Sequence, residues 1–218
     1  NFGLDYDGND FEITSKAPFW DVIIRNSSGG SGEHLLSDGV DVGGTDENLS
    51  AQDLVVLNDL TIESDAWFDA NEKDVYIGRN FTIENDALYE FHENTTVFNG
   101  TEDGVLYVGD ITGLSNPTYT DPEGADPYAD WEQPFYGFTV EKPDGVGLTL
   151  QTGCTYDAGN TSEVKSGGCK NIHDWRSNLV KVTGPFILES GYFDIDVFSV
   201  RLYDEITNKG IFSLNGVP

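Results

Sequence analysis

The sequence contains no methionine, only two cysteines and few basic residues. No run of about eighteen apolar residues occurs, so we expect no helix that spans a membrane and no insertion into one. Because the chain begins at Asn1 without a methionine or a visible signal peptide, we expect a processed product or a segment of something longer. The sequence has 11 Lys and Arg but 39 Asp and Glu, which gives a formal charge of -28. This charge argues against nucleic acid and anionic membrane surfaces as partners.

Helical periodicity is almost absent, and short runs of alternating apolar and polar residues take its place. Such alternation is typical of strands with one buried and one solvated face. Gly, Asn and Asp clusters between the runs favour turns. The alternating apolar pairs are Val22 and Ile24, Val40 and Val42, Leu60 and Ile62, Val75 and Ile77, Phe81 and Ile83, Phe138 and Val140, Val180 and Val182, Phe186 and Leu188, and Val200 and Leu202.

Similar phrases occur twice in the chain. FWDVIIRNSSGGSGEHLL and FYGFTVEKPDGVGLTL both give an aromatic pair, an alternating strand and a Gly-rich turn. DLVVLNDLTIESDAWFD likewise aligns with LVKVTGPFILESGYFD, which sets Val56 on Val182 and Ile62 on Leu188. A phrase repeated at this distance indicates a repeated architecture more than a catalytic motif. Because Trp20 falls at the place of Tyr136, we interpret both as core aromatics.

We therefore predict an all-β fold, a right-handed parallel β-helix (solenoid) that forms one segment over residues 1–218. It would have two related halves, 1–113 and 135–218, separated by an acidic, Pro-rich insert loop at 114–134. Short strands that each bury one face on their neighbours suit stacked coils. The alternative is a pair of antiparallel β-sandwiches, which would also show alternating strands and turn clusters.

Several of these phrases resemble the repeat segments of very large secreted surface proteins of Bacteroidetes, which are typically exported by the type IX secretion system. One group of matches lies in the FYGFTVEKPDGVGLTL phrase, a second in FILESGYFD and a third in NFT. The matching residues are Phe135, Phe138, Val140, Lys142, Gly145, Val146 and Leu148, then Phe186, Leu188, Glu189, Ser190, Gly191 and Phe193, then Asn80, Phe81 and Thr82.

The resemblance implies an adhesin-like or stalk-like protein of stacked β-coils at the cell surface, with no shared catalytic residues to transfer. It also implies neighbouring segments of the same protein as partners. The chain departs from that pattern in two ways, because it has a cysteine pair and lacks the C-terminal sorting domain.

The two cysteines, Cys154 and Cys169, lie in a Gly-rich, polar stretch. The most economical interpretation is a disulfide that closes an exposed excursion, which indicates a compartment outside the cytoplasm. In the loop-entropy model such a closure stabilises the fold by about 3 kcal/mol.

Two acidic stretches are candidate calcium sites. The insert carries Asp121, Glu123, Asp126 and Asp130 within ten residues, and these carboxylates repel one another unless a cation intervenes. Near the N-terminus, Asp5, Asp7 and Asn9 offer oxygen ligands at alternate positions, although the EF-hand pattern fails there. The alternative for both stretches is a solvated loop. We expect no required cofactor, and calcium is the candidate ligand.

Nothing in the sequence indicates an enzyme. The three histidines, His34, His92 and His173, share no metal-ligand spacing. We therefore predict no catalytic residues and a structural or adhesive segment of a secreted protein. The alternative is a carbohydrate-binding or polysaccharide-processing β-helix module, for which Tyr128 and Trp131 beside the insert are the candidate glycan contacts. Its partner would be an extracellular polysaccharide or another surface protein.

Overall fold

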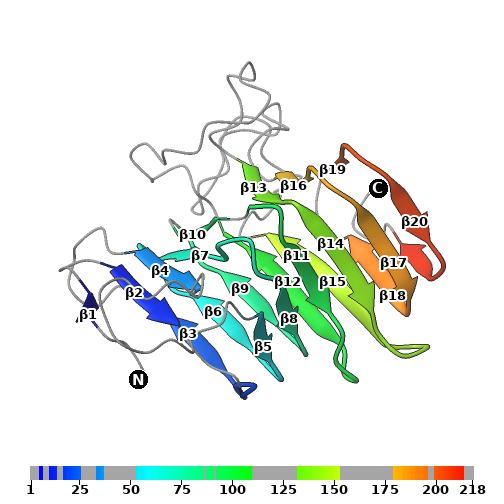
Figure 1. Cartoon of the computed structure of the whole chain (residues 1–218). Coiled ribbons are helices and arrows are strands. Elements are labelled where there is room, and N and C mark those ends of the chain that lie inside the picture. Colours follow the sequence, from blue (N-terminus) through cyan, green and yellow to red (C-terminus); the bar gives the residue numbers. More distant parts are fainter. Residues whose placement is uncertain are drawn as a thin grey trace, which may run out of the picture.

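The computed structural model shows an all-β protein. It describes residues 5–6, 10–13, 17–25, 33–36, 53–85, 87–90, 92–109, 132–152, 179–195 and 199–213. Every regular element in these ranges is a β-strand (Figure 1). No helix long and apolar enough to cross a membrane occurs among these residues.

The strands fall into sheets on three sides of the molecule. A six-stranded sheet holds β5 (Leu54–Val56), β8 (Val75–Ile77), β11 (Thr95–Phe98), β14 (Gly137–Glu141), β17 (Phe186–Ser190) and β20 (Ile206–Asn208). A seven-stranded sheet holds β3 (Val22–Ile24), β6 (Leu60–Ile62), β9 (Phe81–Ile83), β12 (Gly104–Val108), β15 (Gly147–Thr152), β18 (Tyr192–Ile195) and β21 (Ile211–Ser213).

The third side consists of two shorter sheets. The first has five strands: β1 (Asp5–Tyr6), β2 (Asp10–Ile13), β4 (Glu33–Leu36), β7 (Trp67–Asp69) and β10 (Leu88–Glu90). The second has three: β13 (Glu132–Phe135), β16 (Leu179–Val182) and β19 (Ser199–Leu202). The two sheets meet where the Tyr89 ring of β10 lies 5.5 Å from the Phe135 ring of β13.

The chain visits the three sides in a fixed order, from the six-stranded sheet to the seven-stranded sheet and then to the third side. In the six- and seven-stranded sheets each strand pairs in parallel with the strand three positions later, as in β5 with β8 and β6 with β9. We call one such round a coil. Leu54 pairs with Val75, and Val75 pairs with Thr96, so these coils repeat every 21 residues.

This topology confirms the all-β prediction, and its mostly parallel sheets are consistent with a solenoid and not with hairpin-built antiparallel sandwiches. Within the described ranges, β1 with β2 is the one antiparallel pair. The physical reason is the spacing of the strands, because successive strands turn onto a new side of the molecule instead of folding back as hairpins.

The two repeated phrases do not occupy equivalent places in the fold. Val56 lies on β5 in the six-stranded sheet, whereas Val182 lies on β16 on the third side. Ile62 lies in the seven-stranded sheet, whereas Leu188 lies in the six-stranded one. The second phrase is displaced by one side of the coil. The division into halves stays a prediction, but β11 with β14 and β12 with β15 pair across the insert.

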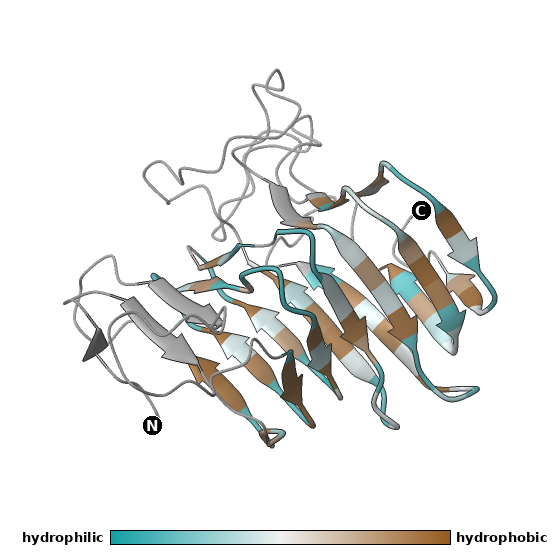
Figure 2. Ribbon diagram, viewed as in Figure 1, coloured by the Kyte–Doolittle hydropathy of each residue, from teal (hydrophilic) through white to brown (hydrophobic). Residues whose placement is uncertain are grey.

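The inward residues of all three sides form one hydrophobic core. Its largest members are aromatic, and they contact one another from coil to coil. The Phe138 ring lies 5.7 Å from that of Phe186, with the two planes only 11° apart. Tyr89 stacks on Phe68 of the same side at 5.8 Å. Figure 2 shows the resulting hydrophobic bands crossing neighbouring strands.

Trp20 contradicts the expectation of a core aromatic, because 67% of its surface is exposed. It lies in the turn between Phe19 and β3, where side chains point away from the core. Tyr136 is partly buried against the core, so the two matched residues have different surroundings.

Two long connections begin at the C-terminal ends of β12 and β15, which are adjacent strands of the seven-stranded sheet. One joins β12 to β13, and the other joins β15 to β16. Their starting points are neighbours, since Val108 pairs with Thr152, and their end points are neighbours too, since Glu132 pairs with Leu179. The fold therefore fixes both ends of one connection beside both ends of the other.

Candidate functional site

Most of the residues predicted to form sites lie outside the described residues. These are the insert carboxylates Asp121, Glu123, Asp126 and Asp130, the glycan candidates Tyr128 and Trp131, the cysteines Cys154 and Cys169, and the N-terminal Asp7 and Asn9. Asp5 is the first residue of β1. The calcium sites, the disulfide and the glycan contacts all stay predictions.

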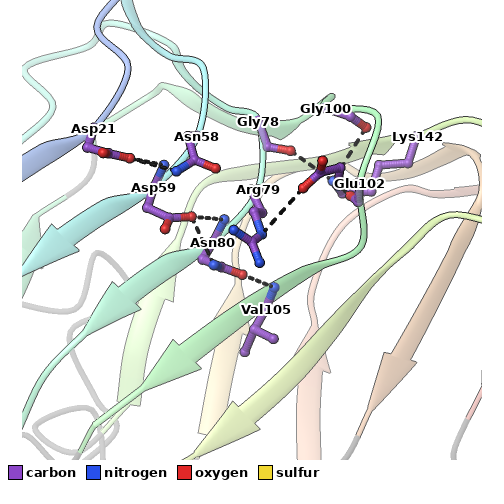
Figure 3. A network of polar contacts seen from close by, with 10 residues as sticks. All are labelled: Asp21, Asn58, Asp59, Gly78, Arg79, Asn80, Gly100, Glu102, Val105 and Lys142. Carbon is purple, nitrogen blue, oxygen red and sulfur yellow. Dashed lines mark hydrogen bonds and ion pairs between the residues drawn. The ribbon is translucent and has the colours of Figure 1, made fainter.

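The most extensive polar network in the described part of the chain lies in the turns between the six- and seven-stranded sheets. We call these turns, residues 20–21, 57–59, 78–80, 99–103 and 142–146, the polar corner. Figure 3 shows the network they form. Because the strands on either side are in parallel register, the turns stack in the same order as the coils.

Side-chain oxygens in the polar corner accept hydrogen bonds from the next coil. Asp21 Oδ1 accepts from the Asp59 backbone N at 3.2 Å and from Asn58 Nδ2 at 2.8 Å. Asp59 Oδ1 accepts from the backbone N and Nδ2 of Asn80 at 3.2 and 2.9 Å. Asn80 Oδ1 then accepts from the Val105 backbone N at 3.0 Å. The ladder joins four successive coils and satisfies backbone groups that the turns leave unpaired.

Glycines let the turns of the polar corner approach closely. A Cβ on Gly78 would lie 1.9 Å from the Leu57 carbonyl oxygen, and one on Gly100 would lie 1.7 Å from the Gly78 carbonyl oxygen. No side chain fits at either distance. The glycines thus bring successive backbone carbonyls to one place.

Lys142 occupies that place. The side chain is buried, with 1% of the residue exposed. Its Nζ donates to the carbonyls of Gly78 at 3.0 Å, Glu102 at 2.8 Å and Gly100 at 3.5 Å (Figure 3). Burial lowers the pKa of Lys142, and the nearby carboxylates of Asp103 and Glu102 oppose that shift. A buried ammonium is tolerated here because carbonyl oxygens of two earlier turns replace its water.

Acidic side chains also join coils at the turns leading into the six-stranded sheet. Asp53 Oδ1 accepts from the Asp74 backbone N at 3.1 Å, and Asp74 Oδ1 accepts from the Thr95 backbone N at 2.7 Å. Just after the C-terminal ends of β6 and β9, Glu84 Oε2 accepts a hydrogen bond from the Ser64 backbone N at 3.0 Å. These carboxylates have structural partners, so their number alone does not indicate metal sites.

A second polar cluster lies around the third side. Nε2 of His92 lies 3.1 Å from Oδ1 of Asp69. Tyr89, fully buried beside this pair, contacts Thr96 Oγ1 at 3.0 Å, and burial raises its pKa to about 12. Glu90 is half-buried on the same strand, and burial followed by the Asp69 carboxylate raises its pKa, with His92 acting against the shift.

The basic side chains described by the structure are engaged in contacts within the chain. Three form ion pairs, Arg25 with Glu63, Arg79 with Glu102, and Lys209 with Glu189. Lys73 Nζ donates to the Asn71 carbonyl at 3.0 Å. Lys181 is buried, with Nζ 4.9 Å from the centre of the Tyr203 ring. The exposed charge of these coils is therefore predominantly negative.

Neither a metal centre nor a catalytic constellation emerges from these contacts. In the ranges that the structure describes, no group of three or more His, Cys, Asp or Glu side chains could hold a metal ion. No protein-family model matches the chain, and neither a curated protein nor a solved structure matches it.

The polar corner was not predicted, although the sequence carries a signal for it. Asp59 and Asn80 each stand directly before an alternating strand, and they are 21 residues apart, which is the length of a coil. Lys142 matched the resembling repeat phrase but was given no role. Its burial depends on Gly78 and Gly100, which are distant in the sequence.

We predict that Lys142→Met lowers the free energy of unfolding by about 3 kcal/mol, because it leaves carbonyl oxygens of the polar corner without a donor. Chemical denaturation followed by circular dichroism measures the change. Lys209→Met removes an equal charge from an exposed ion pair and is the matched control, with an expected loss below about 1 kcal/mol. Equal losses for the two variants would contradict the buried role of Lys142.

We also predict that Glu90→Gln stabilises the protein at pH 7, by about 0.5 kcal/mol. The raised pKa means that the folded state favours protonated Glu90. That contribution to stability is present below the unfolded-state pKa and is lost as the pH rises through the folded-state value. The variant's advantage should therefore disappear as the pH falls to about 4.

Glu93→Gln is the control for Glu90→Gln, because Glu93 is close by and exposed. It tests whether removal of any negative charge from this acidic chain has the same effect. Thermal melts of both variants from pH 4 to pH 8 provide the comparison. An equal gain from Glu93→Gln would show that burial of Glu90 is not the cause.

Proposed function

We propose that the chain is a non-enzymatic structural segment, a stalk or spacer of a large secreted cell-surface protein. In this proposal the coils close into a right-handed parallel β-helix. The observation that carries it is the uninterrupted parallel pairing of the six- and seven-stranded sheets through every coil around one core. Right-handed crossover is the general rule for parallel strands in one sheet.

The spacer function follows from the geometry of such a stack. Each coil adds one strand spacing of about 4.8 Å, so seven strands extend roughly 30 Å along the stack. The polar ladders join neighbouring coils at the turns, which stiffens the stack against shear.

The resemblance to repeat segments of type IX-secreted Bacteroidetes surface proteins supports the same proposal. It suggests an extracellular location and neighbouring segments of the same protein as partners. Calcium remains the proposed ligand of the acidic insert, and the fold needs no cofactor in this proposal.

Removal of one whole coil tests the spacer proposal. Deleting residues 74–94 removes β8, β9 and β10 and should leave a cooperatively folded protein, because β5 and β6 can then pair with β11 and β12 in the same register. Its maximum dimension by small-angle scattering should fall by about 5 Å. Deleting 74–84, about half a coil, is the control and should prevent folding. A 74–94 deletion that unfolds would contradict a modular stack.

A second candidate is a carbohydrate-binding module. One observation favours it: the connections that contain the 114–134 insert and the cysteine pair start from paired residues and return to paired residues. Long connections anchored at neighbouring strand ends of a rigid sheet are a common place for binding.

A glycan array distinguishes the two candidates. The spacer proposal predicts no binding to any polysaccharide on the array. Binding that is lost in Tyr128→Ala and Trp131→Ala, but retained in Tyr107→Ala on the outer face of β12, would favour the carbohydrate module instead.

A further inference from the structure

Three sheet edges are open at the C-terminal end of the stack. β19, β20 and β21 are each the last strand of their sheet, and each pairs on one side only, with β16, β17 and β18. In the described part of the chain no strand pairs with their outer edges. Figure 1 shows this end in orange and red. Open edges present unpaired N–H and C=O groups that can accept another strand.

Core positions are also uncovered at this end. Ile206 is in register with Phe186, and Phe212 is in register with Phe193. Phe186 and Phe193 are each 1% exposed, whereas Ile206 is 57% and Phe212 is 40% exposed. Both side chains therefore occupy the inward column of their sheet, and no strand described by the structure covers them. Isolated apolar residues at a surface are ordinary, but two in adjacent core columns mark an interrupted core.

One inward position is polar. Asn208 is in register with Leu188 and is exposed. A layer that covers this end therefore needs apolar side chains over Ile206 and Phe212 and a polar group over Asn208. Its backbone must run parallel to the three strands to continue their hydrogen bonding.

We propose that the C-terminal end is a docking surface for a further parallel β-coil, tethered to this one by the same polypeptide. The coil would add one strand to each of β19, β20 and β21 and bury Ile206 and Phe212. This inference rests on the proposed spacer function and names the partner that continues the stack. Strand addition at sheet edges is an established mode of recognition.

The small area of the end favours a tethered coil over a separate molecule. Strands of three or four residues are about 10–13 Å long, so three of them border a surface of only a few hundred Å². A specific interface between separate proteins buries about 800 Å² on each partner. A tethered coil has a high effective concentration and does not need that area.

The opposite end of the stack also argues against a second copy as the occupant. There, β1 pairs antiparallel with β2 at the edge of the five-stranded sheet. A second copy stacked head to tail would present that strand to β19, and its direction could not continue all three parallel ladders. A head-to-tail copy therefore cannot continue the parallel pairing on all three sides.

The test appends one coil of known register to the intact chain. Residues 67–85, which contain β7, β8 and β9, supply the three sides in the required order when joined after Pro218. We expect slower hydrogen exchange at the amides of β19, β20 and β21 and a melting temperature higher by about 4 °C or more. The control is the same extension with Phe68, Val75, Ile77, Phe81 and Ile83 of the appended copy changed to serine.

Equal exchange rates in the extension and its serine control would overturn the proposal. A concentration-dependent dimer of the unextended chain that is lost in Ile206→Asp would also overturn it, by assigning the end to a second copy. The coil deletion of residues 74–94 is independent of this end. If that deletion folds while the extension gives no protection, the docking inference fails and the spacer proposal stands.

Discussion

The structure depends on the backbone hydrogen bonds between each strand of the six- and seven-stranded sheets and the strand three positions later. These bonds fix the register of every coil on the one before it, so equivalent residues lie above one another about 4.8 Å apart. Any side chain must then pack against its counterparts in adjacent coils. Phe138 over Phe186 is the apolar result, and Asp59 over Asn80 is the polar one. The core and the polar corner are thus two consequences of one constraint.

The same constraint gives the acidic composition a structural meaning. Asp21, Asp53, Asp59 and Asp74 each accept a hydrogen bond from a backbone N–H of the following coil. A carboxylate in such a place is stabilised by a donor that the turn would otherwise leave unpaired. Lys142 has the opposite charge and the opposite role, because its ammonium group donates hydrogen bonds to backbone carbonyls of neighbouring turns. Part of the charge of -28 therefore supports the fold directly.

The strands could be predicted from the sequence because alternation is a local property. Pairs such as Leu60 and Ile62 or Phe186 and Leu188 are buried on strands as expected. Their assignment to sides of the coil could not be predicted, because all three sides require the same alternation. The alignment of the two repeated phrases therefore paired residues that lie on different sides of the coil, such as Val56 and Val182. The polar corner and the buried Lys142 depend on contacts between distant coils, which no local pattern specifies.

The paired anchors of the two long connections have a consequence for how this protein can change. Val108 and Thr152 lie on adjacent strands of one sheet, as do Glu132 and Leu179 of another, and the parallel pairing of these strands sets their register. The connections from β12 to β13 and from β15 to β16 can therefore change in length or sequence without shifting the register of the strands that flank them. These two connections are therefore suitable places to graft loops, and variation among related chains should concentrate in them.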